Sequence, residues 1–371
     1  MMNVLVLSHT SVLASYRRKW EILSSFPNVQ LTLVIPDAWP EASLAAVRWD
    51  GRQPRSYRIL CVPVWFRGRK GHITRYCFPR TPWILLRMRP DLIHVDNEPF
   101  SLSAFLATLL GRCLGSRIVF TTFENVFRTY RAPLPLFLWT VLRLAHGAQA
   151  ANQEAATLLH RRNFRGVVHV FGFGVDPGPL VPRRHALGRF VIGYVGRLAP
   201  EKGVDLLLEA LGDLPHSVSL RIVGDGPARE ALLALARQLG VTHRVHFTGG
   251  VAPEALGGEL ARMDTLVLPS RTTPIWKEQF GRVLIEAMAR GLPVVGSDSG
   301  AIPEVVGDAG LIVPEGDPKA LAKTLSQLVN DPGLRERLGA AGRARVQTVY
   351  SHERVAEATL ALYRAAFGRG A

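Results

Sequence analysis

Short apolar runs alternate with longer segments in which apolar residues recur every three to four positions along almost the whole chain. The short runs are typical of buried strands and the periodic segments of amphipathic helices. This order predicts βαβ units and parallel sheets. The expected strands are 3–7, 31–35, 58–62, 92–95, 118–121, 167–171, 190–195, 219–223, 245–248, 265–268, 294–297 and 311–313.

The length of 371 residues predicts two domains, because it exceeds what one hydrophobic core usually supports. Segment 173–189 is rich in Gly, Pro and Arg and has no periodicity, which indicates a linker. We therefore expect domains at 1–178 and 179–371. Each should be a Rossmann-like, doubly wound parallel sheet of the α/β class, and the two should face each other across a cleft. The apolar helix 137–142 is expected to lie in the core.

Composition narrows the class of protein. Hydrophobic residues make up 47% and charged residues 20%, as in globular enzymes. Cys61, Cys77 and Cys113 lack metal-ligand or disulfide-framework spacing, which favours a reducing cytoplasm and no metal. Neither a signal peptide nor a membrane span is expected from the apolar runs.

The charge is strongly asymmetric. Residues 1–188 hold 24 Lys and Arg against 10 Asp and Glu, whereas the remainder holds 21 against 20. Segment 48–89 carries eleven basic residues and one acid among several aromatic side chains. This mixture favours an anionic membrane surface as partner, and a solvated basic face is the alternative. The membrane-surface candidates are Arg67, Arg69 and Lys70. No nucleic-acid-binding module is recognisable, so nucleic acid is not expected as a partner.

The segment GRLAPEKGVDLL, residues 196–207, follows an expected strand. Arg197 and Lys202 would then stand on a loop at the carboxyl end of that strand. A guanidinium fork and an ammonium suit a diphosphate. Two exposed loop cations of no function are the alternative reading.

The segment from Glu278 to Glu304 contains a helix expected to begin near Gly281 and to end before Gly291. The first amides of such a helix can bind a phosphate. The residues that would supply them are Phe280, Gly281, Arg282 and Val283.

Two carboxylates flank this phosphate position. Glu286 lies about 7–8 Å along the helix axis from Gly281, within reach of a ribose. Glu278 precedes the helix and would face the donor sugar. A cap and a surface residue are the alternative readings of these two side chains.

A third signal is VGDGPARE, residues 223–230, after an expected strand. Gly224 and Gly226 would let the backbone approach a nucleotide. Arg229 stands where the dinucleotide fingerprint has its last glycine, so the segment does not indicate NAD.

These three segments, in this order, resemble the retaining GT-B glycosyltransferases of family 4 (group 1), and the match covers nearly all of the second domain. The resemblance implies that Arg197 and Lys202 bind the donor diphosphate and act in catalysis. Glu286 would bind ribose, and Glu278 would be the first residue of the family's paired-glutamate motif. The implied reaction moves a hexose from a nucleotide diphosphate sugar to a lipid-linked or cell-envelope acceptor, with retention and with no metal or cofactor. The resemblance also implies that helix 351–371 packs back on the first domain.

The first domain departs from the family pattern. Ser8-His9-Thr10-Ser11 stands where members carry a glycine-rich loop, and His9 is a candidate there. Two further segments, 94–101 and 120–130, resemble acceptor-side loops. Their candidates are Glu98, Glu124 and Asn125, with helix capping as the alternative for the glutamates. His94 is expected to be a core histidine.

Other functions stay open. A sugar-nucleotide 2-epimerase shares the two-domain fold, and a non-catalytic, polyanion-binding degenerate transferase would suit the basic half. A dehydrogenase is disfavoured because no GxGxxG follows the first strand. The location expected for a transferase of this kind is the cytoplasm, peripheral at the inner face of the cell membrane.

Overall fold

The computed structural model describes residues 1–40, 47–66, 73–180 and 189–368. The chain divides into two compact units, which we call unit 1 (Met1–Gly174 with His352–Ala371) and unit 2 (Val175–Ser351). The division falls four residues before the predicted boundary and inside the predicted linker. Arg67, Arg69 and Lys70 lie outside the described residues.

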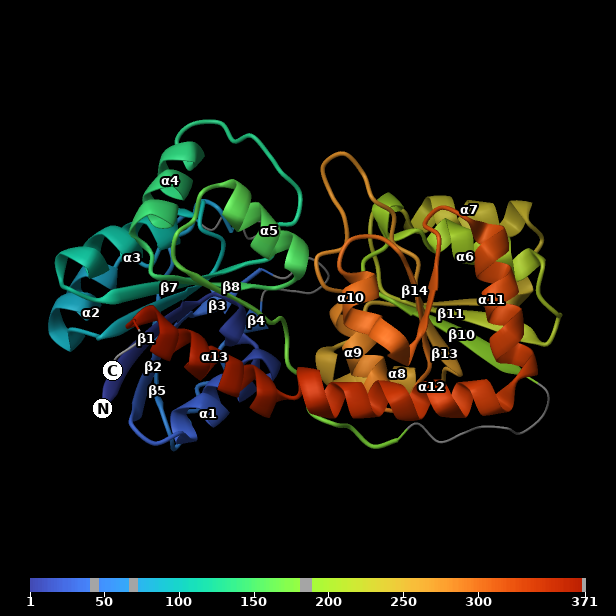
Figure 1. Cartoon of the computed structure of the whole chain (residues 1–371). Helices are drawn as coiled ribbons and strands as arrows, with labels where there is room; N and C mark the ends of the chain where they lie inside the picture. The colour runs from blue at the N-terminus through green and yellow to red at the C-terminus, as the bar shows by residue number, and fades with distance from the viewer. Residues whose placement is uncertain (41–46, 67–72, 181–188, 369–371) are drawn as a thin grey trace. The chain divides into compact units, whose positions relative to one another are not determined.

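Unit 1 contains a parallel sheet whose strand order is β5-β2-β1-β6-β7-β8-β9 (Figure 1). These strands are β1 (Met2–Ser8), β2 (Val29–Pro36), β5 (Arg58–Val62), β6 (Leu92–Asp96), β7 (Arg117–Thr122), β8 (Gly147–Ala150) and β9 (Val167–Val170). A short antiparallel pair, β3 (Ala38–Trp39) and β4 (Val47–Arg48), follows β2.

Helices cover both faces of this sheet. On one face α1 (Arg18–Ser25) packs against α13 (His352–Ala366), which also contacts β7, β8 and β9. On the other face lie α2 (Thr81–Met88), α3 (Leu102–Cys113), α4 (Leu134–Leu144) and α5 (Gln153–Arg161). A separate apolar core fills each face. The C-terminal helix therefore belongs to unit 1.

Besides the unpredicted pair β3 and β4, two features of unit 1 differ from the prediction. Strand β8, with the sequence GAQA, was missed because it has no β-branched or aromatic residue. Its small side chains admit α13, since a Cβ at Gly147 would lie 3.1 Å from the Leu362 side chain. The prediction that helix 137–142 is core was wrong. Val141 is buried, but Trp139 is 64% exposed.

Unit 2 contains a second parallel sheet, of order β12-β11-β10-β13-β14-β15. Its strands are β10 (Phe190–Val195), β11 (Val218–Val223), β12 (Val245–Gly249), β13 (Thr265–Leu268), β14 (Val294–Ser297) and β15 (Leu311–Val313). The strands expected at 190–195, 265–268, 294–297 and 311–313 are confirmed residue for residue.

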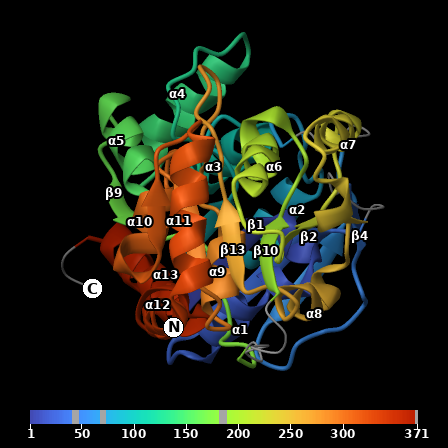
Figure 2. The ribbon, with the colours of Figure 1, turned by 90° about the vertical axis from the view of Figure 1, so that its right-hand side faces the viewer.

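The helices of unit 2 are α6 (Val204–Gly212), α7 (Arg229–Gln238), α8 (Leu256–Leu260), α9 (Arg282–Met288), α10 (Ile302–Val306), α11 (Pro318–Asn330) and α12 (Pro332–Arg345). Helices α6 and α11 pack side by side (Figures 1 and 2). Leucines 206, 207 and 208 of α6 are all buried, because the helix is covered on more than one side. Short 3₁₀ turns and one π turn (Val346–Tyr350) complete the chain.

Candidate donor-binding site at the ends of β10 and β13

Lys202 and Glu278 come together at the carboxyl edge of the unit 2 sheet. Strands β10 and β13 are neighbours, so the segments that follow them meet at one edge. The Lys202 Nζ atom lies 2.8 Å from Glu278 Oε2, and the Ser270 hydroxyl donates to the same oxygen at 2.8 Å. The ammonium also lies 4.6 Å from the ring centre of Trp276. The structure thus joins two predicted residues that stand 76 positions apart.

Burial makes this pair more than a surface contact. Glu278 is 7% exposed and the Lys202 side chain 20%. An ion pair with so little water around it is screened less than an exposed pair, and removing one partner leaves a costly unpaired charge. The second partner of Glu278, Ser270, was missed from the sequence. Its signal was a polar residue two positions beyond the end of β13.

Arg197 differs from Lys202 in its surroundings. It is exposed, and its guanidinium forms no ion pair with another described residue. Its carbonyl accepts a hydrogen bond from the buried Tyr194 hydroxyl at 2.9 Å, which fixes the backbone. Arg197 therefore presents a cation to solvent from an anchored loop.

Gly224 and Gly226 hold two loops of this edge together. A Cβ on Gly224 would overlap the Gly196 carbonyl, and one on Gly226 would overlap the Leu198 carbonyl. The Leu198 N–H donates to the Asp225 carbonyl at 3.0 Å. Contact between the loops after β10 and β11 thus accounts for both glycines, in addition to the nucleotide contact predicted for them.

Helix α9 starts where the sequence predicts. Gly281 has φ +77, and a Cβ there would lie 2.8 Å from the Leu268 side chain, so only glycine fits without strain. The residues that follow, Arg282 and Val283, open the helix. The preceding Phe280 is 3% exposed, and its ring packs edge-on against Tyr350.

Glu286 lies one turn into α9 and is paired with Arg282. The Arg282 Nε atom lies 3.0 Å from Glu286 Oε1. Burial raises the pKa of Glu286, and Arg282 opposes that effect. A half-buried carboxylate whose charge is held by a neighbour is suited to accepting hydrogen bonds from a polyhydroxyl ligand.

The candidates of unit 1 occupy the carboxyl edge of its own sheet. His9 is 7% exposed, its Nδ1 atom lies 3.1 Å from the Tyr76 hydroxyl, and its ring contacts Trp39. Burial lowers the pKa of His9 to about 4, although Asp96 opposes this effect. His9 is therefore neutral at pH 7.

Asp96 anchors the glycine-free loop after β1. The Ser8 hydroxyl donates to Asp96 Oδ2 at 2.8 Å, and Lys19 Nζ lies 3.5 Å from Asp96 Oδ1. Burial opposes ionisation, but Lys19 and the surrounding donors lower the pKa of Asp96 to about 2. The Ser11 hydroxyl also contacts Ser8, at 2.8 Å. Serine hydroxyls and one carboxylate thus order this loop, which contains no glycine.

Glu98, Glu124 and Asn125 are each bonded within unit 1. Glu98 accepts from the Thr122 hydroxyl at 2.6 Å and from the Phe123 N–H at 2.8 Å. Burial raises the pKa of Glu98 to about 7. These contacts fix the backbone that follows β7.

Glu124 accepts from Arg162 and Tyr130, and the Asn125 amide donates to Glu154 at 3.1 Å. All three candidates are at most 7% exposed. These bonds support the loop after β7, and the acceptor-side role of the three residues stays a prediction. His94 is confirmed as a core histidine, because it is fully buried and bonded to Tyr363 and Thr121.

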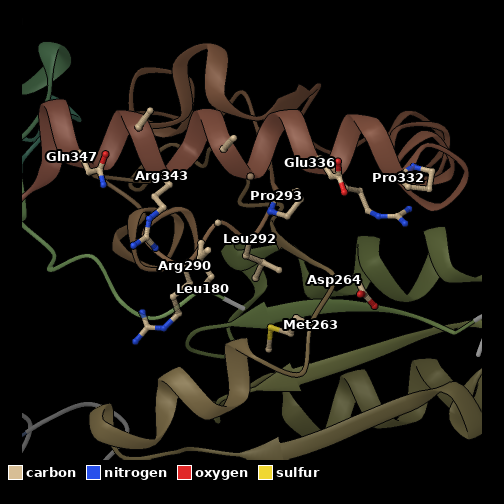
Figure 3. Close-up of a pocket in the computed structure, with 15 residues that line it drawn as sticks. Leu180, Met263, Asp264, Arg290, Leu292, Pro293, Pro332, Glu336, Arg343 and Gln347 are labelled. Atoms are coloured by element: carbon tan, nitrogen blue, oxygen red, sulfur yellow. The ribbon is translucent and has the colours of Figure 1, made fainter. Parts of the chain in front are cut away.

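A pocket of about 530 Å³ lies elsewhere in unit 2, with α12 along one side (Figure 3). Asp264 and Pro293 line it, and they directly precede β13 and β14. The pocket is thus at the amino edge of the sheet, opposite to Lys202 and Glu278. The Arg343 guanidinium, which also lines it, donates to two backbone carbonyls at 2.9 Å. The predicted donor residues Lys202 and Glu278 therefore do not line this pocket.

Among the described residues, no three His, Cys, Asp or Glu side chains gather as a group that could hold a metal ion. No helix in the described ranges is long and apolar enough to cross a membrane.

Comparison with known proteins places the chain in a family. The family described as Glycosyl transferases group 1 matches residues 182–345. The alpha-D-kanosaminyltransferase of Streptomyces kanamyceticus is 30% identical over 345 residues, which cover 84% of this chain and 88% of that protein. The GDP-mannose-dependent alpha-(1-6)-phosphatidylinositol monomannoside mannosyltransferase of Mycolicibacterium smegmatis is 39% identical over 181 residues, or 46% of this chain. That match covers 47% of the relative, so the chain spans about half the length of this mannosyltransferase.

The fold is shared with solved structures. The crystal structure of Anabaena Alr3699/HepE in complex with UDP and glucose has a TM-score of 0.74, with 19% identity over 98% of this chain and 100% of that one. This likeness concerns the fold and confirms the predicted class of two Rossmann-like parallel-sheet domains. The match to the kanosaminyltransferase over 84% of this chain shows that the chain belongs to the group 1 family of GT-B glycosyltransferases.

Proposed function

We propose that the protein is a retaining glycosyltransferase that moves a hexose from a nucleotide diphosphate sugar to a lipid-linked or cell-envelope glycan acceptor. The single observation that supports this most is the buried Lys202–Glu278 pair beside exposed Arg197, at the carboxyl edge of the unit 2 sheet. Ligands of open parallel sheets bind at this edge. Family membership and the relatives' sugar-transfer names support the same class of reaction.

In the proposed reaction the bond between the anomeric carbon of the donor sugar and the diphosphate breaks through an oxocarbenium-like state. An acceptor hydroxyl forms the new bond to that carbon on the same face, and its proton passes to the departing diphosphate. Negative charge then develops on the departing diphosphate. Lys202 and Arg197 stabilise that charge, together with the first amides of α9. Glu278 holds Lys202 in place and lies where positive charge develops on the sugar. Glu286 accepts hydrogen bonds from the ribose hydroxyls.

We propose that no metal or cofactor takes part, because these cations and amides supply the charge that a divalent ion would otherwise supply. Transfer that survives a chelator such as EDTA would agree with this. A requirement for added Mg²⁺ or Mn²⁺ would contradict it.

We also propose that the protein works in the cytoplasm at the inner face of the cell membrane. An acceptor with a lipid anchor requires the enzyme at an interface, and the basic surplus of unit 1 suits anionic lipids. No nucleic acid is involved in this proposal.

The test starts with the donor. The melting temperature should be measured with UDP, GDP and ADP and with their hexose conjugates, because a ligand that binds only the native state raises it. The stabilising donor is then incubated with lipid extracts, and the anomeric configuration of the product is determined by NMR. Stabilisation by none of these nucleotides, or a product of inverted configuration, would refute the proposal.

A further inference from the structure

Helices α2, α3 and α4 cover one face of the unit 1 sheet, and each exposes large apolar side chains. Trp83 is 62% exposed, Leu86 60% and Trp139 64%. Leu109 of α3 and Leu136 of α4 are exposed as well. Helix α3 packs against both α2 and α4, so the three helices form one continuous layer (Figure 1).

The charges of this layer have a single sign. The sequences of α2, α3 and α4 contain no Asp or Glu, and each helix carries an exposed arginine in its last turn. These are Arg87, Arg112 and Arg143. Each arginine follows an exposed apolar residue of its helix by three or four positions, which places the two on the same side of the helix. The Arg87 guanidinium lies 5.7 Å from the ring centre of Trp83.

The helices on the opposite face of the unit 1 sheet, α1 and α13, expose charged side chains of both signs. The exposed positions of α13 include Glu353, Arg354 and Glu357, and an ion pair of 2.9 Å joins the last two. Helix α1 exposes Arg18 and Glu21, paired at 2.8 Å. Neither helix exposes a large apolar side chain. Large apolar side chains are thus exposed on α2, α3 and α4 and not on α1 or α13. Unit 1 also exposes Trp65, Phe66 and Phe127, which lie outside these helices.

We propose that this layer, defined by Trp83, Leu86, Arg87, Leu109, Arg112, Leu136, Trp139 and Arg143 and called the α2–α4 face, binds the surface of an anionic lipid bilayer. Tryptophan and leucine enter the headgroup region, and arginines without competing acids bind lipid phosphates. A second copy of the chain fits less well, because a symmetric dimer through this face would bring arginines against arginines. The inference rests on the proposed function only for its purpose, which is delivery of unit 1 to a lipid-linked acceptor.

The test uses the full chain without donor. Sedimentation is measured with vesicles of phosphatidylcholine alone and with vesicles containing 30 mol% phosphatidylglycerol. We expect binding to the anionic vesicles only, with release by high salt. The charge reversal Arg87→Glu, Arg112→Glu, Arg143→Glu should lower the partition coefficient by about a hundredfold or more. The double change Trp83→Ala, Trp139→Ala should lower it about tenfold or more, whereas Trp83→Phe, Trp139→Phe should retain most of it.

Matched controls come from unit 2. Arg237, Lys319 and Lys323 are also exposed on helices, and changing all three to Glu gives the same change in net charge. That control should bind anionic vesicles nearly as well as the parent chain. All variants alter exposed side chains, and a melting curve for each confirms that it is folded.

Three results would overturn the inference. They are equal binding to both kinds of vesicle, an equal loss in the unit 2 control, and concentration-dependent dimers that the Trp83→Ala, Trp139→Ala change dissociates. Melting shifts with nucleoside diphosphates are recorded on the same samples. Vesicle binding without nucleotide binding would refute the proposed function alone, and nucleotide binding without vesicle binding would refute this inference alone.

Discussion

The two units share one architecture and differ strongly in the charge that they carry. Unit 1 holds 25 Lys and Arg against 11 Asp and Glu, a balance of +14, whereas unit 2 holds 20 against 19, a balance of +1. In unit 2 the candidate charges meet each other at one sheet edge, as Lys202 and Glu278 do. In unit 1 the candidate carboxylates form hydrogen bonds to neighbouring side chains, Glu98 to Thr122 and Glu124 to Arg162.

This difference suggests that the functional groups of the two units are arranged in different ways around similar parallel sheets. Unit 2 concentrates chemistry in a few paired side chains, so single substitutions there should change the reaction. Unit 1 distributes its properties over a surface and a buried network, so single substitutions there should change stability or partitioning. The predictions for Lys202, Glu98 and Glu286 below separate these two behaviours.

The largest effect is expected at Lys202. Lys202→Ala should lower kcat by about a hundredfold to a thousandfold, because the cation stabilises charge that appears in the transition state. Arg197→Ala should lower kcat by well over tenfold. Steady-state kinetics with the identified donor measures both.

Lys319→Ala is the matched control, an exposed lysine on α11 that should leave kcat unchanged. Near-normal turnover in both the Lys202 and Arg197 variants would mean that the paired cluster of unit 2 is structural. The contrast between the two units would then fail.

The next largest effect concerns the geometry that carries α9. Gly281→Ala should lower the free energy of unfolding by about 3 kcal/mol, from the positive φ and from contact with Leu268. Gly240→Ala is the control, because its φ is +69 but no atom lies within 4 Å of the added Cβ. It should cost about 1 kcal/mol. Urea unfolding compares the two, and equal costs would show that Leu268 yields without penalty.

The pH dependence of stability should reveal the role of Glu98 in unit 1. Its pKa is raised from 4.5 to about 7 by burial, so the native state binds more protons than the unfolded state between those values. Its contribution to stability is therefore fully present below pH 4.5 and is lost as pH rises through 7. Glu98→Gln mimics the protonated form and should raise the free energy of unfolding by the order of 2 kcal/mol at pH 8, with little change at pH 5. Denaturant unfolding at the two pH values measures this.

The same variant should keep its transfer rate if Glu98 only supports the loop after β7. A loss of kcat with unchanged stability at pH 8 would instead make Glu98 an acceptor-side group. Unit 1 would then contain reaction chemistry like that of unit 2.

Most of this architecture could be predicted from hydrophobic patterning, because strands buried on both faces form continuous apolar runs. What escaped prediction depends on contacts between distant segments. Strand β8 is made of small residues that fit beneath α13, and α13 comes some 200 residues later. Apolar α4 was expected in the core because the periodicity of a helix cannot show which of its sides find a partner, and Trp139 of α4 finds none that covers it.

Some residues of the candidate site could likewise be predicted from the sequence, and others could not. Lys202 and Glu278 could be predicted from motifs on contiguous segments, and their pairing follows from the adjacency of β10 and β13. Ser270 escaped because a single serine beyond a strand carries no pattern. The ion pair of Glu124 could not be predicted either, because its partner Arg162 lies 38 residues later, immediately after α5.

The smallest effect is expected at Glu286, where binding rather than rate should change. Glu286→Ala should weaken the affinity for the free nucleoside diphosphate and for the donor by a similar factor of about ten, because contacts to the ribose are present before and during the reaction. A hydrogen bond to a charged acceptor is worth about 1.5–3 kcal/mol, which sets this scale.

The contribution of Glu286 should also depend on pH. Burial raises the pKa of Glu286, so lowering the pH should protonate this carboxylate and weaken nucleotide binding at pH values still above the ordinary pKa of 4.5. The Glu286→Ala variant should lack this dependence. Titration calorimetry with the nucleoside diphosphate measures both, with Glu209→Ala on the exposed side of α6 as control. Unchanged diphosphate affinity in folded Glu286→Ala would assign the carboxylate to Arg282 alone, and α9 would then serve unit 2 as a scaffold in the way that the Glu98 and Glu124 loops serve unit 1.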